Sequence, residues 1–316
     1  MASTPPGGDR AGSAVHASVT VSIELWRLVF CLAVVLYHSC YLTPTRSLTS
    51  VFQGGYIGVD FFFIVSGLLM AMNIDRYSSG ALFSDTYAFV KRKTARIYPC
   101  FLFAFLISFA VRMIIGRFSA AQAAGYALRS VPELLLLRMS GIPGYWVNTP
   151  TWYISAMLIS MLLLFPLLLI LKDKQYPLIF MLLSALSYGW LFFTMGSLEN
   201  PYRWQGMFYS GLVRAVAGIS LGVFCFRVSA GIREAALSAH ILSAAELFCY
   251  IAVLLHSSVT GRSHADFLLV LLLAAAVSVS FSGKASTAGF FSRYERPCLI
   301  CGEFSLALYL NHRVFT

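Results

Sequence analysis

The sequence predicts an all-α membrane protein, a polytopic bundle of about nine transmembrane helices. Of its 316 residues, 59% are hydrophobic and only 11% are charged, whereas soluble domains carry about 25% charged residues. The apolar residues gather in runs of about 20, the length that crosses a hydrocarbon core of about 30 Å. Short polar loops separate these runs. A lipid bilayer is therefore the solvent that fits this composition.

The nine candidate spans follow one another along the chain. They lie near 21–42, 56–72, 99–116, 149–171, 176–195, 209–227, 240–258, 265–282 and 298–316. The stretch 120–139 has two arginines, a glutamate and a proline around its leucines, which favours an interfacial amphipathic segment over a span. The last span stops at Thr316 without a polar loop, as in a C-terminally truncated chain.

The N-terminal residues differ from the rest of the chain. Residues 1–20 are rich in Gly, Ser, Ala and Pro, and they lack the apolar core and cleavage site of a secretory signal. We therefore expect a disordered cytoplasmic tail at 1–20 and a single transmembrane domain at 21–316.

The distribution of basic residues predicts the orientation. The loop from Asn73 to Pro99 holds five of them, whereas the loop from Thr43 to Gly55 holds only Arg46. Because cytoplasmic loops carry the excess of Lys and Arg, the first loop and the N-terminus are expected on the cytoplasmic side. Alternation then places further basic residues there: Lys172, Lys174, Arg227, Arg233, Lys284, Arg293 and Arg296. Membrane orientation thus explains the formal charge of +10, and we expect no nucleic-acid partner.

The seven cysteines do not predict a disulfide framework or a metal site. They lie mostly inside apolar runs and lack regular spacing, so we interpret them as small packing residues. Cys298 and Cys301 form a C-x-x-C pair, but no second pair of ligands lies nearby in the sequence.

Ionisable residues inside predicted spans are candidate functional residues, because an Arg at a helix centre costs about 2.5 to 3.5 kcal/mol on insertion scales. Arg27 and His38 are eleven residues apart in the first span. That is almost three helical turns, so they share a face about 16 Å apart along the axis. Glu24 lies one turn before Arg27 and can pair with it. The alternative for Arg27 is an anchor at the membrane interface.

Asp60 is expected at the same depth as His38, one turn into the second span. A carboxylate beside a histidine fixes its tautomer and raises its basicity, which predicts a catalytic pair. A buried hydrogen-bonded pair without a catalytic role is the alternative. His312 in the last span and Arg214 in the sixth can line the same cavity, unless they anchor loops or the interface.

Five stretches of the sequence carry a recognisable pattern. The first, IELWRLVFCLAVVLYH, has ten residues between Arg27 and His38. The second, GGYIGVDFFFIVSGLLM, combines Gly-Val-Asp, with Asp60, an aromatic run and Ser-Gly. The third, FVKRKTARIYP, is a basic run ending in Arg-Ile-x-Pro, with charged positions at Arg92, Lys93 and Arg96.

The fourth stretch, PTWYISAMLISMLLLFP, is a Trp-Tyr helix, and the fifth, LALYLNHRVF, has a Tyr-Leu-x-His pattern that ends at His312. Together the five stretches resemble acyltransferase family 3, over nearly the whole chain after residue 20. Two departures accompany the resemblance. Ala156 and Met157 stand where many members carry a glutamate, and members usually have one or two further helices.

The resemblance implies transfer of an acyl group, commonly acetyl from cytoplasmic acetyl-CoA, to a hydroxyl of an extracytoplasmic cell-envelope carbohydrate. It also implies a bacterial cytoplasmic membrane. Arg92, Lys93 and Arg96 suit the phosphates of acyl-CoA, although the positive-inside rule alone also accounts for basic residues there. We expect His38 to act as general base or transient acyl carrier, oriented by Asp60, while Arg27 holds the thioester arm or the phosphates.

Two other functions fit a polytopic chain with a few buried charges. One is a non-enzymatic carrier or exporter of an envelope precursor, although the sequence has no convincing inverted repeat. The other is the sensing or anchoring part of a larger product.

Overall fold

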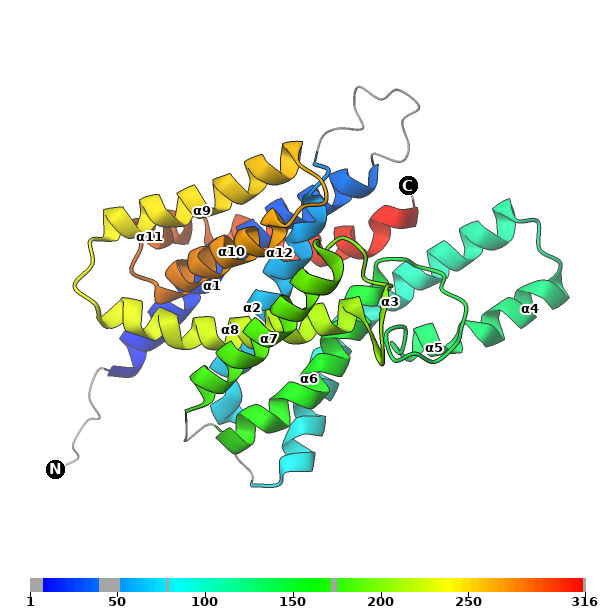
Figure 1. Ribbon diagram of the computed structural model, residues 1–316, viewed down its shortest axis with the longest axis horizontal. Coiled ribbons are helices and arrows are strands. Elements are labelled where there is room, and N and C mark those ends of the chain that lie inside the picture. The colour runs from blue at the N-terminus through cyan, green and yellow to red at the C-terminus, as the bar shows by residue number, and fades with distance from the viewer. Residues whose placement is uncertain (1–7, 40–51, 78–79, 172–174, 315–316) are drawn as a thin grey trace.

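The computed structural model describes residues 8–39, 52–77, 80–171 and 175–314, with residues 8–20 and 314 as backbone only. This part of the chain is almost entirely helical (Figure 1). Eight of its helices are long and apolar enough to cross a membrane, which confirms the predicted all-α polytopic bundle. They are α1 (Gly8–Ser39), α2 (Gly58–Met72), α3 (Leu82–Ile115), α6 (Thr151–Leu171), α7 (Tyr176–Met195), α8 (Ser210–Glu234), α9 (Ala239–Val259) and α10 (Ala265–Ser282).

The remaining elements are shorter and lie between or after these helices. They are η1 (Gly55–Ile57), η2 (Ile74–Arg76), α4 (Ala120–Arg129), α5 (Val131–Leu134), α11 (Ser286–Ser292), α12 (Glu295–Asn311) and η3 (His312–Val314). Two two-residue strands, β1 (Trp204–Gln205) and β2 (Phe208–Tyr209), pair antiparallel in the loop between α7 and α8.

Two predicted spans differ from the structure in their bounds. The last one, 298–316, corresponds to α12 and η3, and α12 has only 17 residues and is not among the eight long apolar helices. The third, 99–116, is the second half of α3, because the helix continues through Pro99. Four of the five basic residues that we expected in a loop before Pro99 therefore lie on the first half of α3, and the fifth, Arg76, lies on η2. A proline is tolerated inside a membrane helix where neighbouring groups satisfy the freed backbone carbonyl.

The N-terminal part also differs in detail. Helix α1 begins at Gly8, inside the stretch 1–20 expected as a tail. Residues 1–7 lie outside the described residues, as do Arg46, Lys172 and Lys174. The division into a tail and one transmembrane domain stays a prediction.

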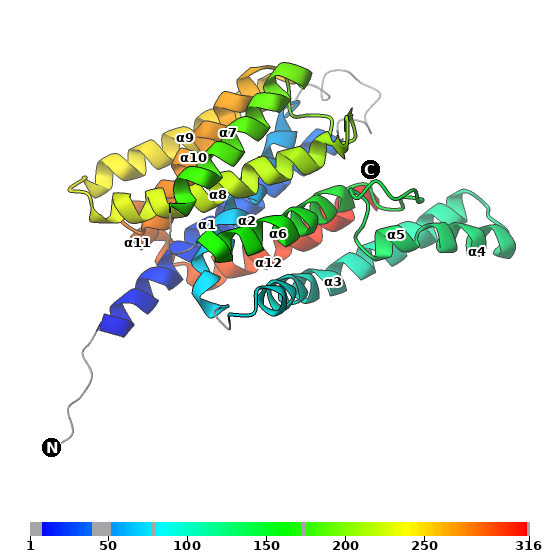
Figure 2. The ribbon, with the colours of Figure 1, turned by 60° about the horizontal axis from the view of Figure 1, so that its bottom comes forward.

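The segment predicted as interfacial folds as the two short helices α4 and α5. Ser119 caps α4: its hydroxyl accepts from the backbone N–H of Gln122, and the Gln122 side chain accepts from the backbone N–H of Ser119. Figure 2 shows α3 and α4 reaching out from the rest of the bundle. Only 28% of the α3 span is buried, compared with 89% of the α2 span.

Helix α2 lies at the centre of the bundle and packs closely on α8. Gly67 of α2 lies against the backbone of Ile219, and Gly222 of α8 lies against the backbone of Ile64. A Cβ at either glycine would collide with a backbone atom of the facing helix. Small residues thus allow the two backbones to approach, as is usual for helix pairs in membranes.

We name the two ends of the bundle after residues of α1. The His38 end contains the start of α2, α6, α8 and α10 and the end of α1, α7 and α9 (Figure 1). Hydrogen bonds tie this end together: Gly54 N–H donates to Ser257 O (2.9 Å), and Asn148 Nδ2 donates to Leu310 O (2.8 Å). The Arg27 end is the opposite one.

Candidate functional site

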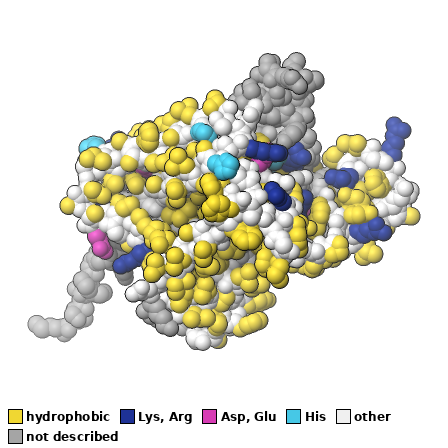
Figure 3. All heavy atoms as spheres, in the orientation of Figure 1, with side chains coloured by type: hydrophobic (Ala, Val, Ile, Leu, Met, Phe, Trp, Pro, Cys, Tyr) yellow, Lys and Arg dark blue, Asp and Glu magenta, His cyan; other side chains and the backbone are white. Residues whose placement is uncertain are grey.

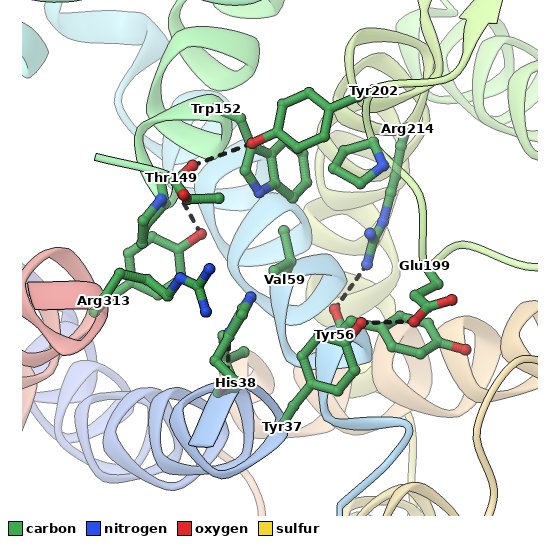
Figure 4. A pocket seen from close by; sticks show the side chains of 14 residues that line it. Tyr37, His38, Tyr56, Val59, Thr149, Trp152, Glu199, Tyr202, Arg214 and Arg313 are labelled. Atoms are coloured by element: carbon green, nitrogen blue, oxygen red, sulfur yellow. Dashed lines mark hydrogen bonds between the residues drawn. The ribbon is translucent and has the colours of Figure 1, made fainter. Parts of the chain in front are cut away.

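A cavity of about 220 Å³ lies at the His38 end (Figure 4). Segments far apart in the sequence form its wall: α1, η1 with α2, the loop before α6, the loop after α7, α8, α12 and η3. The lining residues are Val34, Tyr37, His38, Tyr56, Val59, Thr149, Pro150, Trp152, Glu199, Pro201, Tyr202, Arg214, Tyr309 and Arg313. The structure thus brings His38 and Arg214, two of the predicted site residues, to one cavity.

The tautomer of His38 is fixed by its neighbours. Its Nδ1 lies 2.9 Å from the carbonyl oxygen of Val34, one helical turn earlier, so Nδ1 carries the proton. The same nitrogen lies 3.3 Å from Nε2 of His312, whose own Nδ1 donates to the Tyr309 carbonyl oxygen at 2.7 Å. Nε2 of His312 is therefore an acceptor. This leaves Nε2 of His38 as an unprotonated nitrogen, and no described residue hydrogen-bonds to it.

Asp60 does not contact His38, which corrects the predicted pair. Its carboxylate, fully buried, accepts from Arg214 Nη2 at 2.5 Å and Nε at 3.1 Å, and from the Tyr188 hydroxyl at 3.0 Å. The physical reason is charge: a buried carboxylate gains more from an adjacent guanidinium than from a neutral imidazole. Val34 and His312, rather than Asp60, orient the imidazole of His38.

Arg214 acts as a clamp between four segments of the His38 end. Besides Asp60, it donates to the carbonyl oxygens of Leu198 (2.6 Å) and Tyr56 (2.8 Å). The network continues through the Tyr56 hydroxyl, which donates to Asp266 at 2.9 Å. Arg214 is only 2% exposed. Its charge is neutralised by Asp60, and its position indicates a structural role in the cavity wall.

A second ion pair holds the loop that carries Thr149. The buried carboxylate of Glu133 accepts from the backbone N–H groups of Val147 and Asn148 and from the Thr151 hydroxyl (2.7 Å). Arg138 lies 3.7 Å away. Burial raises the pKa of Glu133 above its ordinary value, although these hydrogen bonds and Arg138 act in the opposite direction.

Two charged residues of the cavity were not predicted from the sequence. Glu199 accepts from the Tyr37 hydroxyl at 2.7 Å and pairs with Arg262. Arg313 projects from η3 toward the cavity, beside His38 (Figure 4). Arg313 directly follows His312, so its position in that motif was an available signal. Glu199 lies in an irregular loop whose sequence gives no such signal.

The other predicted site residues gather near the Arg27 end. Arg27 donates to Glu24 at 2.8 Å, and the Glu24 carboxylate lies against Gly302 of α12, where a side chain would displace it. Lys93, half-buried on α3, lies close enough to Arg27 and Arg96 for their charges to repel. Arg92 and Arg96 are exposed.

A seam between α1 and α12 connects the two ends. It is formed by Glu24, Cys31 and His38 on one side and Gly302, Ser305 and His312 on the other. Cys31 Sγ donates to the Ser305 carbonyl oxygen at 3.2 Å. The face of α1 that carries Arg27 and His38 therefore faces α12. Across the described residues, no three His, Cys, Asp or Glu side chains come together as a metal site requires.

Hydrophobic side chains cover much of the visible face of the molecule (Figure 3), as expected for a surface in contact with lipid. The polar cavity at the His38 end contrasts with this surface. It holds an imidazole with a free basic nitrogen, several aromatic rings and a guanidinium, a combination suited to proton transfer from a bound hydroxyl group.

Comparisons with known proteins are consistent with this chemistry. A family model described as an acyltransferase domain matches residues 20–316 of the chain. No curated protein and no solved structure shows significant similarity to it.

Proposed function

The chain belongs to acyltransferase family 3 and is a multi-pass membrane acyltransferase, and we propose that it transfers acetyl from acetyl-CoA to a hydroxyl of a cell-envelope carbohydrate. The donor binds at the Arg27 end, on the cytoplasmic side of a bacterial membrane. The acceptor binds in the cavity at the His38 end, on the outer side. The product is an O-acetylated carbohydrate.

The observation that carries this proposal is the free Nε2 of His38. Its Nδ1 proton is directed to the Val34 carbonyl oxygen and to His312, so Nε2 is the basic nitrogen at a cavity that admits a hydroxyl compound. We assign His38 as the general base that takes the acceptor proton. His312, which holds the tautomer of His38, is a positioning residue.

The cavity suits a carbohydrate. Trp152, Tyr202 and Tyr37 offer aromatic surfaces with polar edges, and Glu199 offers a carboxylate to sugar hydroxyls. Most of the wall is fixed by the Arg214 clamp and the Glu133 pair, so the acceptor meets preformed contacts.

The cations at the Arg27 end support binding of the donor. Lys93 lies close to both Arg27 and Arg96, and an anion stabilises like charges at close range. The phosphates of acetyl-CoA supply such charge, and arginine binds them with two parallel hydrogen bonds. Along α1, Arg27 and His38 are about 16 Å apart, so the long pantetheine arm has to follow the α1–α12 seam.

The first experiment compares wild type with His38→Ala, in nanodiscs, by release of free CoA thiol from acetyl-CoA. Loss of a general base lowers turnover by about 10²- to 10⁴-fold, and the KM for acetyl-CoA should not change. His240→Ala, which removes an exposed histidine of α9, is the matched control and should retain wild-type turnover.

Turnover by His38→Ala at the wild-type rate would refute the assignment of the base. Movement of a labelled carbohydrate across the membrane without CoA release would instead support the carrier function.

A further inference from the structure

We propose that Arg313 is a further catalytic residue, which binds the oxyanion that develops on the acyl carbonyl during transfer. The inference rests on the proposed function. The charges of the cavity wall carry it. Arg214 is neutralised by Asp60, and Glu199 is paired with Arg262. Arg313 lines the same cavity, yet it has neither an ion pair nor a hydrogen bond with the described chain.

An uncompensated guanidinium in a partly buried site is costly unless it meets a negative charge during function. Arg313 is half-buried. An anion that forms transiently in the cavity provides the missing partner.

The position of Arg313 is set by the residues that position the base. It follows His312, which is held by Tyr309 and by His38, and the preceding turn is fixed by the Asn148 hydrogen bond to Leu310. The guanidinium lies close enough to both imidazoles to interact with them electrostatically. Figure 4 shows Arg313 and His38 facing the same space.

Hydrogen-bond donors placed near the reacting carbonyl stabilise the oxyanion that develops there. The acceptor oxygen must lie about 2.6 to 3.2 Å from Nε2 of His38 to give up its proton. It must also lie about 3 to 3.5 Å from the acyl carbon. The carbonyl oxygen then lies close to the imidazole, in the cavity that Arg313 also lines.

The acceptor oxygen forms a bond to the acyl carbon while its proton moves to Nε2 of His38, and the carbonyl π electrons move to oxygen. Arg313 donates N–H groups to this oxyanion. When the intermediate collapses, the carbonyl re-forms, the C–S bond breaks, and the thiolate of CoA takes the proton from His38. The products are the acetylated acceptor and free CoA.

The test uses wild type, Arg313→Gln, Arg313→Lys and Arg313→Ala in nanodiscs with acetyl-CoA and three acceptors: water, methyl glucoside and methyl glucuronide. Removal of one oxyanion donor lowers kcat by about 10²- to 10³-fold. We expect this loss in Arg313→Gln with all three acceptors, at unchanged KM for acetyl-CoA. Arg313→Lys should recover part of the rate, and added guanidinium ion should partly restore Arg313→Ala. Arg117→Gln, which removes an exposed arginine just after α3 and outside the cavity lining, is the control.

Three outcomes would overturn the inference. Wild-type kcat in Arg313→Gln would exclude a role in the transition state. A raised KM for the anionic glucuronide, or a rate that is lost only with this acceptor, would show that Arg313 anchors an anionic acceptor instead. A wild type that releases no CoA with any acceptor would overturn the proposed function, and this inference with it. An active wild type with a fully active Arg313→Gln variant would refute the inference alone.

Discussion

The two ends of the bundle compensate their charges in different ways. At the His38 end, each buried carboxylate of Asp60 and Glu133 has an arginine of the chain beside it. At the Arg27 end, Glu24 pairs with Arg27, but Lys93 near Arg27 and Arg96 near Lys93 have no ion pair with a carboxylate of the described residues. The buried carboxylates of the first end are thus compensated within the protein, whereas the cations of the second end gain from an external anion.

The difference follows from solvent access. Asp60 and Arg214 are removed from water, where an unpaired charge costs several kcal/mol, so they must pair within the protein. Arg96 is exposed and Lys93 is half-buried, so water screens their repulsion until a ligand arrives. We therefore expect substitutions at the His38 end to reduce stability, and substitutions at the Arg27 end to reduce donor binding.

The largest effect is expected from Asp60→Ala. This variant leaves Arg214 buried without its carboxylate, which destabilises a protein by about 3 to 5 kcal/mol. The double variant Asp60→Leu/Arg214→Met removes both charges and should recover most of the loss. Thermal unfolding in detergent measures the stability, and CoA release measures the activity. A double variant that is stable but inactive would show that this pair has a chemical role, and would weaken the contrast between the ends.

A smaller effect on a different property is expected from Lys93→Ala/Arg96→Ala. Hydrogen bonds to charged groups contribute about 1.5 to 3 kcal/mol each, so the loss of two such groups should raise the KM for acetyl-CoA by about a hundredfold. Thermal stability should stay the same. Raising the salt concentration should weaken donor binding in wild type more than in the variant. Lys91→Ala, an exposed lysine on the same helix, is the control. An unchanged KM for acetyl-CoA would mean that Lys93 and Arg96 only set the orientation of the chain in the membrane.

The smallest effect is expected from Glu133→Gln. Because burial raises the pKa of Glu133 above its ordinary value, the folded state binds the proton more tightly than the unfolded state does. The stability of wild type should therefore fall, relative to Glu133→Gln, as pH rises from the ordinary glutamate pKa through the raised one. Unfolding temperatures of the two proteins over this range test the sign. Glu234→Gln, at an exposed position, should show no such trend.

The sequence predicted much of the fold but fewer of the contacts in the site. Runs of about 20 apolar residues specify spanning helices, because the bilayer leaves few other ways to satisfy the backbone. The periodicity of α1 also predicted that Arg27 and His38 share a face. It did not predict that Pro99 would lie inside one long helix, since that depends on neighbouring groups.

The sequence by itself thus determined the all-α membrane architecture, the pairing of Glu24 with Arg27 and the set of candidate ionisable residues, because local periodicity and solvent fix these properties. Only the tertiary structure decided which charges meet. It paired Asp60 with Arg214, placed His312 against His38 and brought Arg313 into the cavity. These partners are up to 274 residues apart in the sequence. No local pattern specifies such a contact, because it depends on how the spanning helices pack and on which pairing leaves the fewest buried charges uncompensated.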